Sequence, residues 1–501
     1  MLAALSVSAA GVAGAARPQY GGVLRVELRA ASVSLEPARW KAGSPDLASS
    51  QRLADLLFDR LVWLDNYGRF QPQLATEWTH DAAARRWLFT LRAGVKFSDG
   101  TALTPGDVVS AWQRLLPRGM QISATPSGVA IECAKPARDL LELLASGPYL
   151  VYKNAGGVPR GTGPFVLESV SAGVRGADRG QGDPAPAQPE RLRFRFNELC
   201  WSGRPYLDSV EVALGVPPER ALLDLQLGKT DLAELSVDTV KRAQQSNLKC
   251  WASAPLTLYA LHFSGDGKAE TEQLLRAAVA LSVDRAAIAG VLLQKQAEPT
   301  AAFLPQWLSG YAFLFAAESN VERAQELRAK LPASAVGVRE PLRVSVDASN
   351  EVSKLVAERV VVNARAAGLR LQTVRGSARA SSEGAAPKSD GEAQLVAWRY
   401  TSLSPRTSLE NLATVLRWTL PDGGVPEDPD ARYAWEKRML DEDNLMPLVA
   451  VPDFAGVHTR VRNWSPAPWG AWRLADVWLE SAEPASRAAG AGTKALPGAK
   501  P

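Results

Sequence analysis

A short stretch near residue 400 combines the side-chain types that a binding site for an organic solute needs. It reads LVAWRYTSLSPR from Leu395 to Arg406 and holds two aromatic rings, several hydroxyls and two guanidinium groups. Aromatic rings cover apolar or sugar faces, and a guanidinium such as that of Arg406 pairs in a bidentate manner with an anionic group. The residues predicted to contact a ligand here are Trp398, Tyr400, Thr401, Ser402 and Arg406.

Three residues from elsewhere in the chain are further predicted ligand contacts: Glu36, Trp40 and Tyr259. Clefts that bind small molecules are built from aromatic side chains with a few polar groups. Fifteen tryptophans in the chain fit such a pocket. Trp398 and Tyr259 have a second interpretation, because large aromatic residues also pack in cores and hinges.

Residue types for bond-breaking chemistry are scarce. The three histidines, His80, His262 and His458, have no second histidine or cysteine at metal-ligand spacing, and the motifs Gly-x-Ser-x-Gly and His-Glu-x-x-His are absent. We therefore predict no catalytic residue, no metal and no cofactor. A pair of carboxylates can still hydrolyse a glycosidic bond, so a hydrolase stays open as the less favoured alternative.

The three cysteines, Cys133, Cys200 and Cys250, are odd in number and widely spaced. One disulfide with a free thiol, or three core cysteines, are both compatible with this pattern.

Length and composition indicate a globular protein with large cores. The chain has 501 residues, of which 46% are hydrophobic, and this length favours two to four domains or lobes. The net charge is +4 without a dense basic block, which argues against nucleic acid as a partner.

The first sixteen residues are typical of a secretory leader. Leu2 to Ala16 is apolar and uncharged, and Ala13-Gly14-Ala15 resembles a cleavage site. A positive segment before the apolar run is missing, which suggests a truncated leader or a late start codon; a merely alanine-rich N-terminus is the alternative. Because no cysteine lies near the cleavage point, we expect export to the periplasm without a lipid anchor.

The stretch from Trp87 to Leu116 predicts a strand, a turn and a capped helix. Trp87, Phe89 and Leu91 alternate as on a strand with one buried face, and Asp99-Gly100 marks a turn. Thr104-Pro105-Gly106-Asp107 has the capping oxygen, the proline and the acidic residue that open a helix.

This stretch resembles the signature region of the family 5 extracellular solute-binding proteins, the receptors of peptide, nickel and oligosaccharide ABC importers. Two more stretches resemble family markers in the same order, Gly161 to Phe165 and Asn197 to Asp208. The signature residues that match are Arg92, Lys96, Phe97, Ser98, Asp99, Gly100, Thr104, Asp107 and Val108.

The resemblance implies an α/β fold of two lobes, the periplasmic binding protein fold of type II and class C-like, with a discontinuous first lobe. Apolar strands at Leu256–Phe263 and Leu445–Val451 would cross between the lobes as a two-strand hinge. Leu342 to Leu371 reads as a strand–helix–strand unit with a parallel pair. The expected divisions are a leader at 1–16, lobe I at 20–257 with an inserted subdomain at about 45–155, lobe II at 258–446, a return to lobe I at 447–482, and a disordered tail at 483–501.

The same resemblance implies a monomer that captures a peptide or peptide-like small solute by hinge closure and delivers it to an ABC permease with its ATPase. One departure bears on the ligand. Peptide-binding relatives carry aspartates where Thr401 and Ser404 stand, and the first of these pairs with the peptide's α-ammonium. A hydroxyl does not replace a buried ion pair. A non-peptide ligand, such as an oligosaccharide or a metal chelate, and a sensory role therefore stay open as alternatives.

Overall fold

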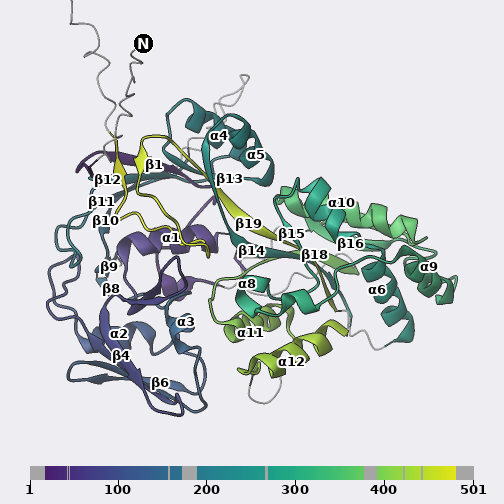
Figure 1. Ribbon diagram of the computed structural model, residues 1–501, viewed down its shortest axis with the longest axis horizontal. Coiled ribbons are helices and arrows are strands. Elements are labelled where there is room, and N and C mark those ends of the chain that lie inside the picture. Colours follow the sequence, from purple (N-terminus) through teal and green to yellow (C-terminus); the bar gives the residue numbers. More distant parts are fainter. Residues whose placement is uncertain are drawn as a thin grey trace, which may run out of the picture.

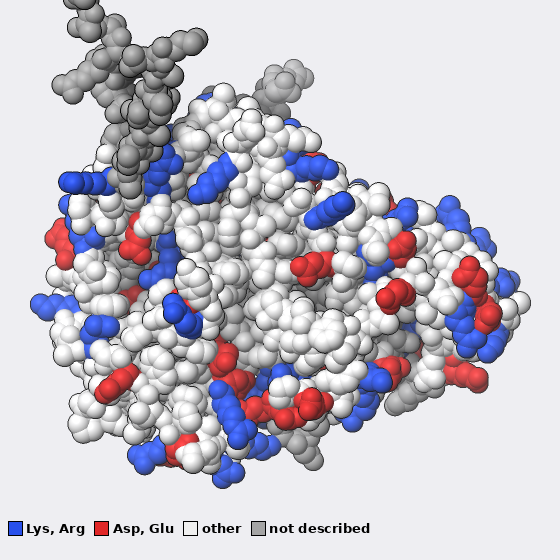
Figure 2. All heavy atoms as spheres, in the orientation of Figure 1, with Lys and Arg blue, Asp and Glu red and all other residues white. Residues whose placement is uncertain are grey.

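The computed structural model describes residues 17–41, 43–44, 46–155, 158–171, 189–265, 269–376, 392–420, 424–441 and 444–480 (Figure 1). The expected leader at 1–16 and tail at 483–501 lie outside these residues. None of the described helices is long and apolar enough to cross a membrane. Figure 2 shows basic and acidic side chains interspersed over the face in view, without a broad patch of either sign.

A mixed sheet of eleven strands runs through the described part of the molecule. Ten strands follow one another across it, and β15 (Glu298–Pro299) pairs with β19 off this path. Their order is β10 (Phe165–Ser171), β11 (Arg191–Phe196), β12 (Ser209–Ala213), β1 (Val23–Glu27), β13 (Leu232–Leu235), β19 (Leu445–Val457), β14 (Lys249–Phe263), β18 (Ala393–Arg399), β16 (Leu342–Asp347) and β17 (Leu371–Gly376).

The first lobe is built on the half of this sheet from β10 to β13. α1 (Leu47–Leu57), α4 (Pro218–Gln226) and α5 (Val237–Gln245) pack beside it. Apolar side chains of β1, β11 and β12 alternate inward and share a core with α1 and with the closing segment around Trp472. Three short hairpins complete the lobe: β2 (Val62–Leu64) with β3 (Phe70–Pro72), β8 (Tyr152–Ala155) with β9 (Val158–Gly161), and β20 (Val461–Arg462) with β21 (Trp478–Leu479).

A separate four-stranded sheet has its own core within residues 61–151. Its order is β4 (Ala75–His80), β5 (Arg86–Leu91), β7 (Gly128–Cys133) and β6 (Met120–Thr125), with α2 (Pro105–Trp112) and α3 (Leu140–Leu144). The predicted strand and capped helix are confirmed, because Thr104 and Asp107 form a reciprocal capping box. The fully buried Trp112 anchors α2 in this core.

The second lobe contains the predicted strand–helix–strand unit. β16 and β17 pair in parallel, and α10 (Glu351–Ala366) connects them. α6 (Glu270–Ser282) packs against α9 (Val321–Lys330) farther out (Figure 1). The remaining helical segments are α7 (Arg285–Ala287), η2 (Ile288–Leu292), α8 (Gln306–Ser309), η3 (Ala312–Leu314), α11 (Pro405–Leu416) and α12 (Pro429–Asp441), with η1 (Pro37–Arg39) in the first lobe.

The two long strands β14 and β19 connect the lobes through the centre of the molecule (Figure 1). They pair antiparallel, β19 also pairs with β13 of the first lobe, and β14 pairs with β18 of the second. Pro255 and Pro452 face each other at a register shift. Because proline has no backbone N–H, neither residue can donate to the ladder, and the pair of strands is weakest where it passes between the lobes.

Both strands are longer than the sequence predicted. In β14 the prediction found only the apolar part, because residues 249–254 are largely half-buried or exposed. β19 continues past the predicted end at Val451 to Val457, and its last four residues are buried. Cys133, Cys200 and Cys250 are free thiols, Cys133 being buried, so the structure has no disulfide between them.

A buried carboxylate on α12 holds the loop that leads to α8. Glu436 is fully buried and accepts hydrogen bonds from the backbone N–H groups of Phe303 and Leu304, at 2.5 and 3.3 Å, and from the Tyr311 hydroxyl at 2.8 Å. Burial raises the pKa of Glu436 to about 7, although these three donors act in the opposite direction.

The raised pKa makes stability depend on pH. The folded state prefers protonated Glu436, so this contribution is complete below the ordinary carboxyl pKa of 4.5 and is lost as pH rises through about 7. Glu436→Gln keeps the shape and an acceptor without the charge. Between pH 5 and pH 8 the wild type loses this contribution and the variant does not. We expect the unfolding free energy of the variant, relative to that of the wild type, to rise by on the order of 3 kcal/mol over this range. Urea unfolding across this range measures the difference, and a gap that does not change with pH would contradict the assignment.

Candidate functional site

A cavity of about 250 Å³ lies between the lobes, next to the hinge. The first lobe contributes α1 and the segments 145–147 and 467–475, the hinge contributes Leu256, and the second lobe contributes Trp307 and residues 399–403. A solute in this cavity would touch both lobes at once. Such a position makes the affinity for the solute depend on how the lobes are placed.

Four half-buried tryptophans line the cavity: Trp63, Trp201, Trp307 and Trp469. The indole N–H of Trp307 donates to the carbonyl of Pro255 at 2.8 Å, and that of Trp201 donates to Asp59 at 2.9 Å. Both rings are thereby fixed by their polar edges. The Arg92 guanidinium lies 4.3 Å from the centre of the Trp201 ring, and the parts of both rings that line the cavity remain for contact. None of the four was predicted from the sequence to contact a ligand. The abundance of tryptophan was the available signal, and Trp201 lies inside the third family marker.

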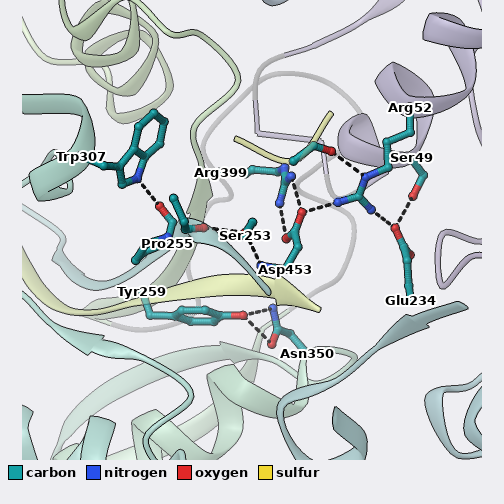
Figure 3. A network of polar contacts seen from close by, with 12 residues as sticks. Ser49, Arg52, Glu234, Ser253, Pro255, Tyr259, Trp307, Asn350, Arg399 and Asp453 are labelled. Atoms are coloured by element: carbon teal, nitrogen blue, oxygen red, sulfur yellow. Dashed lines mark hydrogen bonds and ion pairs between the residues drawn. The ribbon is translucent and has the colours of Figure 1, made fainter. Parts of the chain in front are cut away.

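A polar network joins both lobes to the hinge beside this cavity (Figure 3). Arg399, at the end of β18, donates to both oxygens of Asp453 on β19 at 2.6 Å each. Arg52 on α1 also pairs with Asp453 and with Glu234 on β13. Its Nε donates to the Gly470 carbonyl at 3.2 Å. One carboxylate on a hinge strand thus holds a guanidinium from each lobe.

The electrostatics of Asp453 follow from this pairing. Burial by itself would raise its pKa, but the charges of Arg399 and Arg52 and their hydrogen bonds outweigh burial and hold the pKa well below its usual range. Arg52 is 5% exposed and also stacks over the Trp472 ring at 4.6 Å. The Asp453 carboxylate is therefore ionised at neutral pH and held between two guanidinium groups.

A second carboxylate at the cavity is sealed by neutral donors. Asp59 is buried and accepts hydrogen bonds from Gln73 at 2.6 Å, Thr162 at 2.8 Å and Trp201 at 2.9 Å. Burial raises the pKa of Asp59, with the three donors acting against the shift. This carboxylate positions the Trp201 wall of the cavity.

Three of the residues predicted to contact a ligand line this cavity: Tyr400, Thr401 and Ser402. The Tyr400 hydroxyl is already used, because it donates to the carbonyl of Phe303. Thr401 is half-buried, and its side chain makes no hydrogen bond with another described residue. Its hydroxyl therefore remains for a ligand.

The other five predicted residues do not line this cavity. Trp398 and Tyr259 are 3% and 6% exposed and belong to apolar cores, and the Tyr259 hydroxyl lies 3.5 Å from the side-chain amide of Asn350. Glu36 pairs with Arg39, and the Trp40 indole donates to the Ser34 carbonyl. Arg406 pairs with Asp139. Their roles as ligand contacts stay predictions.

The lobes also touch on the side away from the hinge. Arg406 of α11 donates to Asp139 of the first lobe at 2.9 Å, and the Leu403 N–H donates to Ser146 at 3.0 Å. Ser404 bonds Asp139 and caps α11 through the Thr407 N–H. A larger cavity of about 980 Å³ opens here and shares Gly147, Thr401 and Ser402 with the first. The two cavities form one cleft.

No group of three His, Cys, Asp or Glu side chains in the described part of the chain is arranged to hold a metal ion. Two lobes, a sheet shared through two hinge strands and a cleft lined from both sides define a two-lobe binding protein. The chain belongs to the bacterial extracellular solute-binding proteins, family 5, whose sequence model, described for the middle of these proteins, matches residues 69–418. The fold class inferred from the resemblance is confirmed.

Several known proteins similar to this chain are binding proteins. A probable deoxycholate-binding periplasmic protein of Escherichia coli is 45% identical over 58 residues, 12% of this chain and 11% of that protein. Di/tripeptide-binding protein 2 of Pseudomonas aeruginosa is 23% identical over 322 residues, 58% of this chain and 59% of that protein. The chain thus spans less than two thirds of these curated relatives. The solved structure of OppA from Haemophilus influenzae in complex with RPPGFSPFR matches this chain with a TM-score of 0.72 at 17% identity. The match covers 91% of this chain and 98% of the OppA chain, and it supports the fold.

The network around Asp453 predicts a large loss of stability when its charge is removed. Asp453→Asn leaves Arg52 and Arg399 without their shared counter-ion in an enclosed place, and we expect the free energy of unfolding to fall by about 3–5 kcal/mol in urea titrations. Asp238→Asn is the matched control, because Asp238 forms an exposed pair with Arg242 at 3.7 Å and we expect a change below about 1 kcal/mol. Equal effects of the two substitutions would contradict the role given to the network.

Proposed function

We propose that this protein captures a peptide or peptide-like solute in the cleft between its lobes and delivers it to the permease of an ABC importer. The observation that carries the proposal is the cavity next to the hinge, whose walls come from both lobes and from a hinge strand. A site of this kind is complete only when the lobes are together. Binding then favours the closed state, which is the form that an importer can recognise.

The mechanism follows from the parts around the cavity. The facing prolines of β14 and β19, Pro255 and Pro452, give the hinge a place to bend. Asp453 keeps a guanidinium of each lobe beside the cavity, and the contacts of Asp139 with α11 close its outer side. Tryptophans enclose the apolar part of the solute, and the hydroxyl of Thr401 meets a polar group. No step changes a covalent bond of the solute.

The similar proteins support binding without catalysis. The relatives described above are a probable deoxycholate-binding protein and a di/tripeptide-binding protein, and the OppA structure holds RPPGFSPFR. The family relationship favours the importer role over a sensory one. The proposal further includes export to the periplasm by the leader at 1–16, a monomeric state, and a partner permease with its ATPase.

Native mass spectrometry of the mature protein, purified from a periplasm without unfolding, tests the proposal. We expect one peptide-like solute per chain, identified by fragmentation after release. Trp469→Ala removes one wall of the cavity, and we expect it to lower the affinity for that solute about tenfold or more.

Phe313→Ala is the matched control, because Phe313 is 73% exposed and lies outside the cavity. We expect this variant to retain the solute. An empty wild-type protein that no peptide stabilises against heating would overturn the proposal, since a bound ligand raises the melting temperature by mass action.

A further inference from the structure

Cationic side chains outnumber carboxylates along the cleft. Seven cationic side chains line the two cavities: Arg52, Arg60, Arg118, Lys135, Arg399, Arg406 and Arg473. Three carboxylates line them: Asp55, Asp59 and Glu410. The chain as a whole is nearly balanced at a net charge of +4, so this excess is local to the cleft.

The three carboxylates already have partners. Arg60 pairs with Asp55, and Asp59 accepts hydrogen bonds from three neutral groups. The Val425 N–H donates to Glu410 at 3.3 Å. Burial also raises the pKa of Asp59 and of Glu410, which favours their neutral forms. Asp55 is thus in an ion pair, whereas Asp59 and Glu410 accept hydrogen bonds only from neutral donors and burial favours their neutral forms. The described carboxylates of the cleft are therefore poor partners for an ammonium group of a solute.

Four of the cations are neutralised within the protein. Arg52 and Arg399 pair with Asp453, Arg60 pairs with Asp55, and Arg406 pairs with Asp139. No described carboxylate lies within 4 Å of the other three, Arg118, Lys135 and Arg473. Of these, only Arg473 lines the cavity next to the hinge.

Arg473 is held in a geometry that suits an anion. Its guanidinium lies 3.7 Å from the centre of the Trp63 ring, and its side chain is exposed to the cavity. Three carboxylates interact with its charge from a distance but form no ion pair with it: Asp476, Asp59 and Asp55. Stacking orders the planar group and leaves its edge N–H donors for bidentate bonds to an oxyanion.

We propose that the solute carries an anionic oxygen group, a carboxylate in a peptide-like solute, which binds Arg473 beside Trp63, and that it presents no ammonium group to the cleft. This proposal rests on the proposed function and adds the chemical class of the solute. The apolar body of the solute packs on Trp201, Trp307 and Trp469, and the Thr401 hydroxyl accepts or donates a neutral hydrogen bond. N-acylated peptides and amine-free amphipathic acids belong to this class.

The test uses one dipeptide body, phenylalanyl-leucine, in four forms that combine a free or acetylated amine with a free or amidated carboxyl group. Titration calorimetry of the full chain after removal of carried solute measures the affinities. We expect the N-acetylated acid to bind best and its amide to bind about tenfold to a hundredfold more weakly, because charge-assisted hydrogen bonds are lost.

Variants assign the effect to Arg473. Arg473→Gln is expected to weaken the N-acetylated acid about tenfold or more, and Arg473→Lys to recover part of the loss through its charge. Arg323→Gln on α9 is the matched control, because Arg323 is an exposed arginine that does not line either cavity.

Three results would overturn the inference: best binding by a form with a free amine, no binding by the N-acetylated acid, or an unchanged affinity in Arg473→Gln. Native mass spectrometry separates these from failure of the proposed function. A wild-type protein that carries a solute with an ammonium group refutes the solute class alone, whereas a protein that carries and binds no solute refutes both.

Discussion

The pairing of Asp453 with Arg52 and Arg399 is the interaction on which the arrangement of this protein depends. A carboxylate on the hinge strand β19 is held by a guanidinium from helix α1 of the first lobe and by another from strand β18 of the second. Enclosed charges of this kind are costly unless every partner is present. The elements that line the cavity are therefore fixed relative to one another at one point, next to the place where the strands cross.

The hinge complements this fixed point. β14 and β19 pair in both lobes, with one register shift between Tyr259 and Ala260 in the second lobe. Pro255 and Pro452 oppose each other where the strands pass between the lobes. Few backbone hydrogen bonds need to be lost for the strands to bend there. Farther out, the lobes are joined by a few side-chain contacts, such as the ion pair of Arg406 on α11 with Asp139, and these contacts have to break when the lobes separate. In this account the lobes close and open at the outer contacts, while the ion pairs of Asp453 hold them together beside the hinge.

The fold could be predicted from the sequence because its signals are local. The alternation of Trp87, Phe89 and Leu91 and the Thr104 cap each specify an element without distant information, and the structure has both. The start of β14 was missed because residues 249–254, which precede its apolar run, include polar and partly exposed side chains. The expected lobe boundaries stay predictions, and the leader at 1–16 lies outside the described residues.

The site was only partly predictable, because the first lobe is split in sequence. Thr401 and Ser402 reach the cavity as expected, but Trp63, Trp469 and Arg473 come from segments that only the folded chain brings together. Trp398 packs in a core, which was the second interpretation of this residue. Its neighbour on the strand, Arg399, lines the cavity instead.

Small-angle X-ray scattering of the protein with and without its released solute would test most directly whether a solute closes the lobes. We predict a smaller radius of gyration at saturating solute than after its removal, because both lobes contribute walls to one cavity. An identical radius of gyration in the two states would contradict closure of the lobes around the solute.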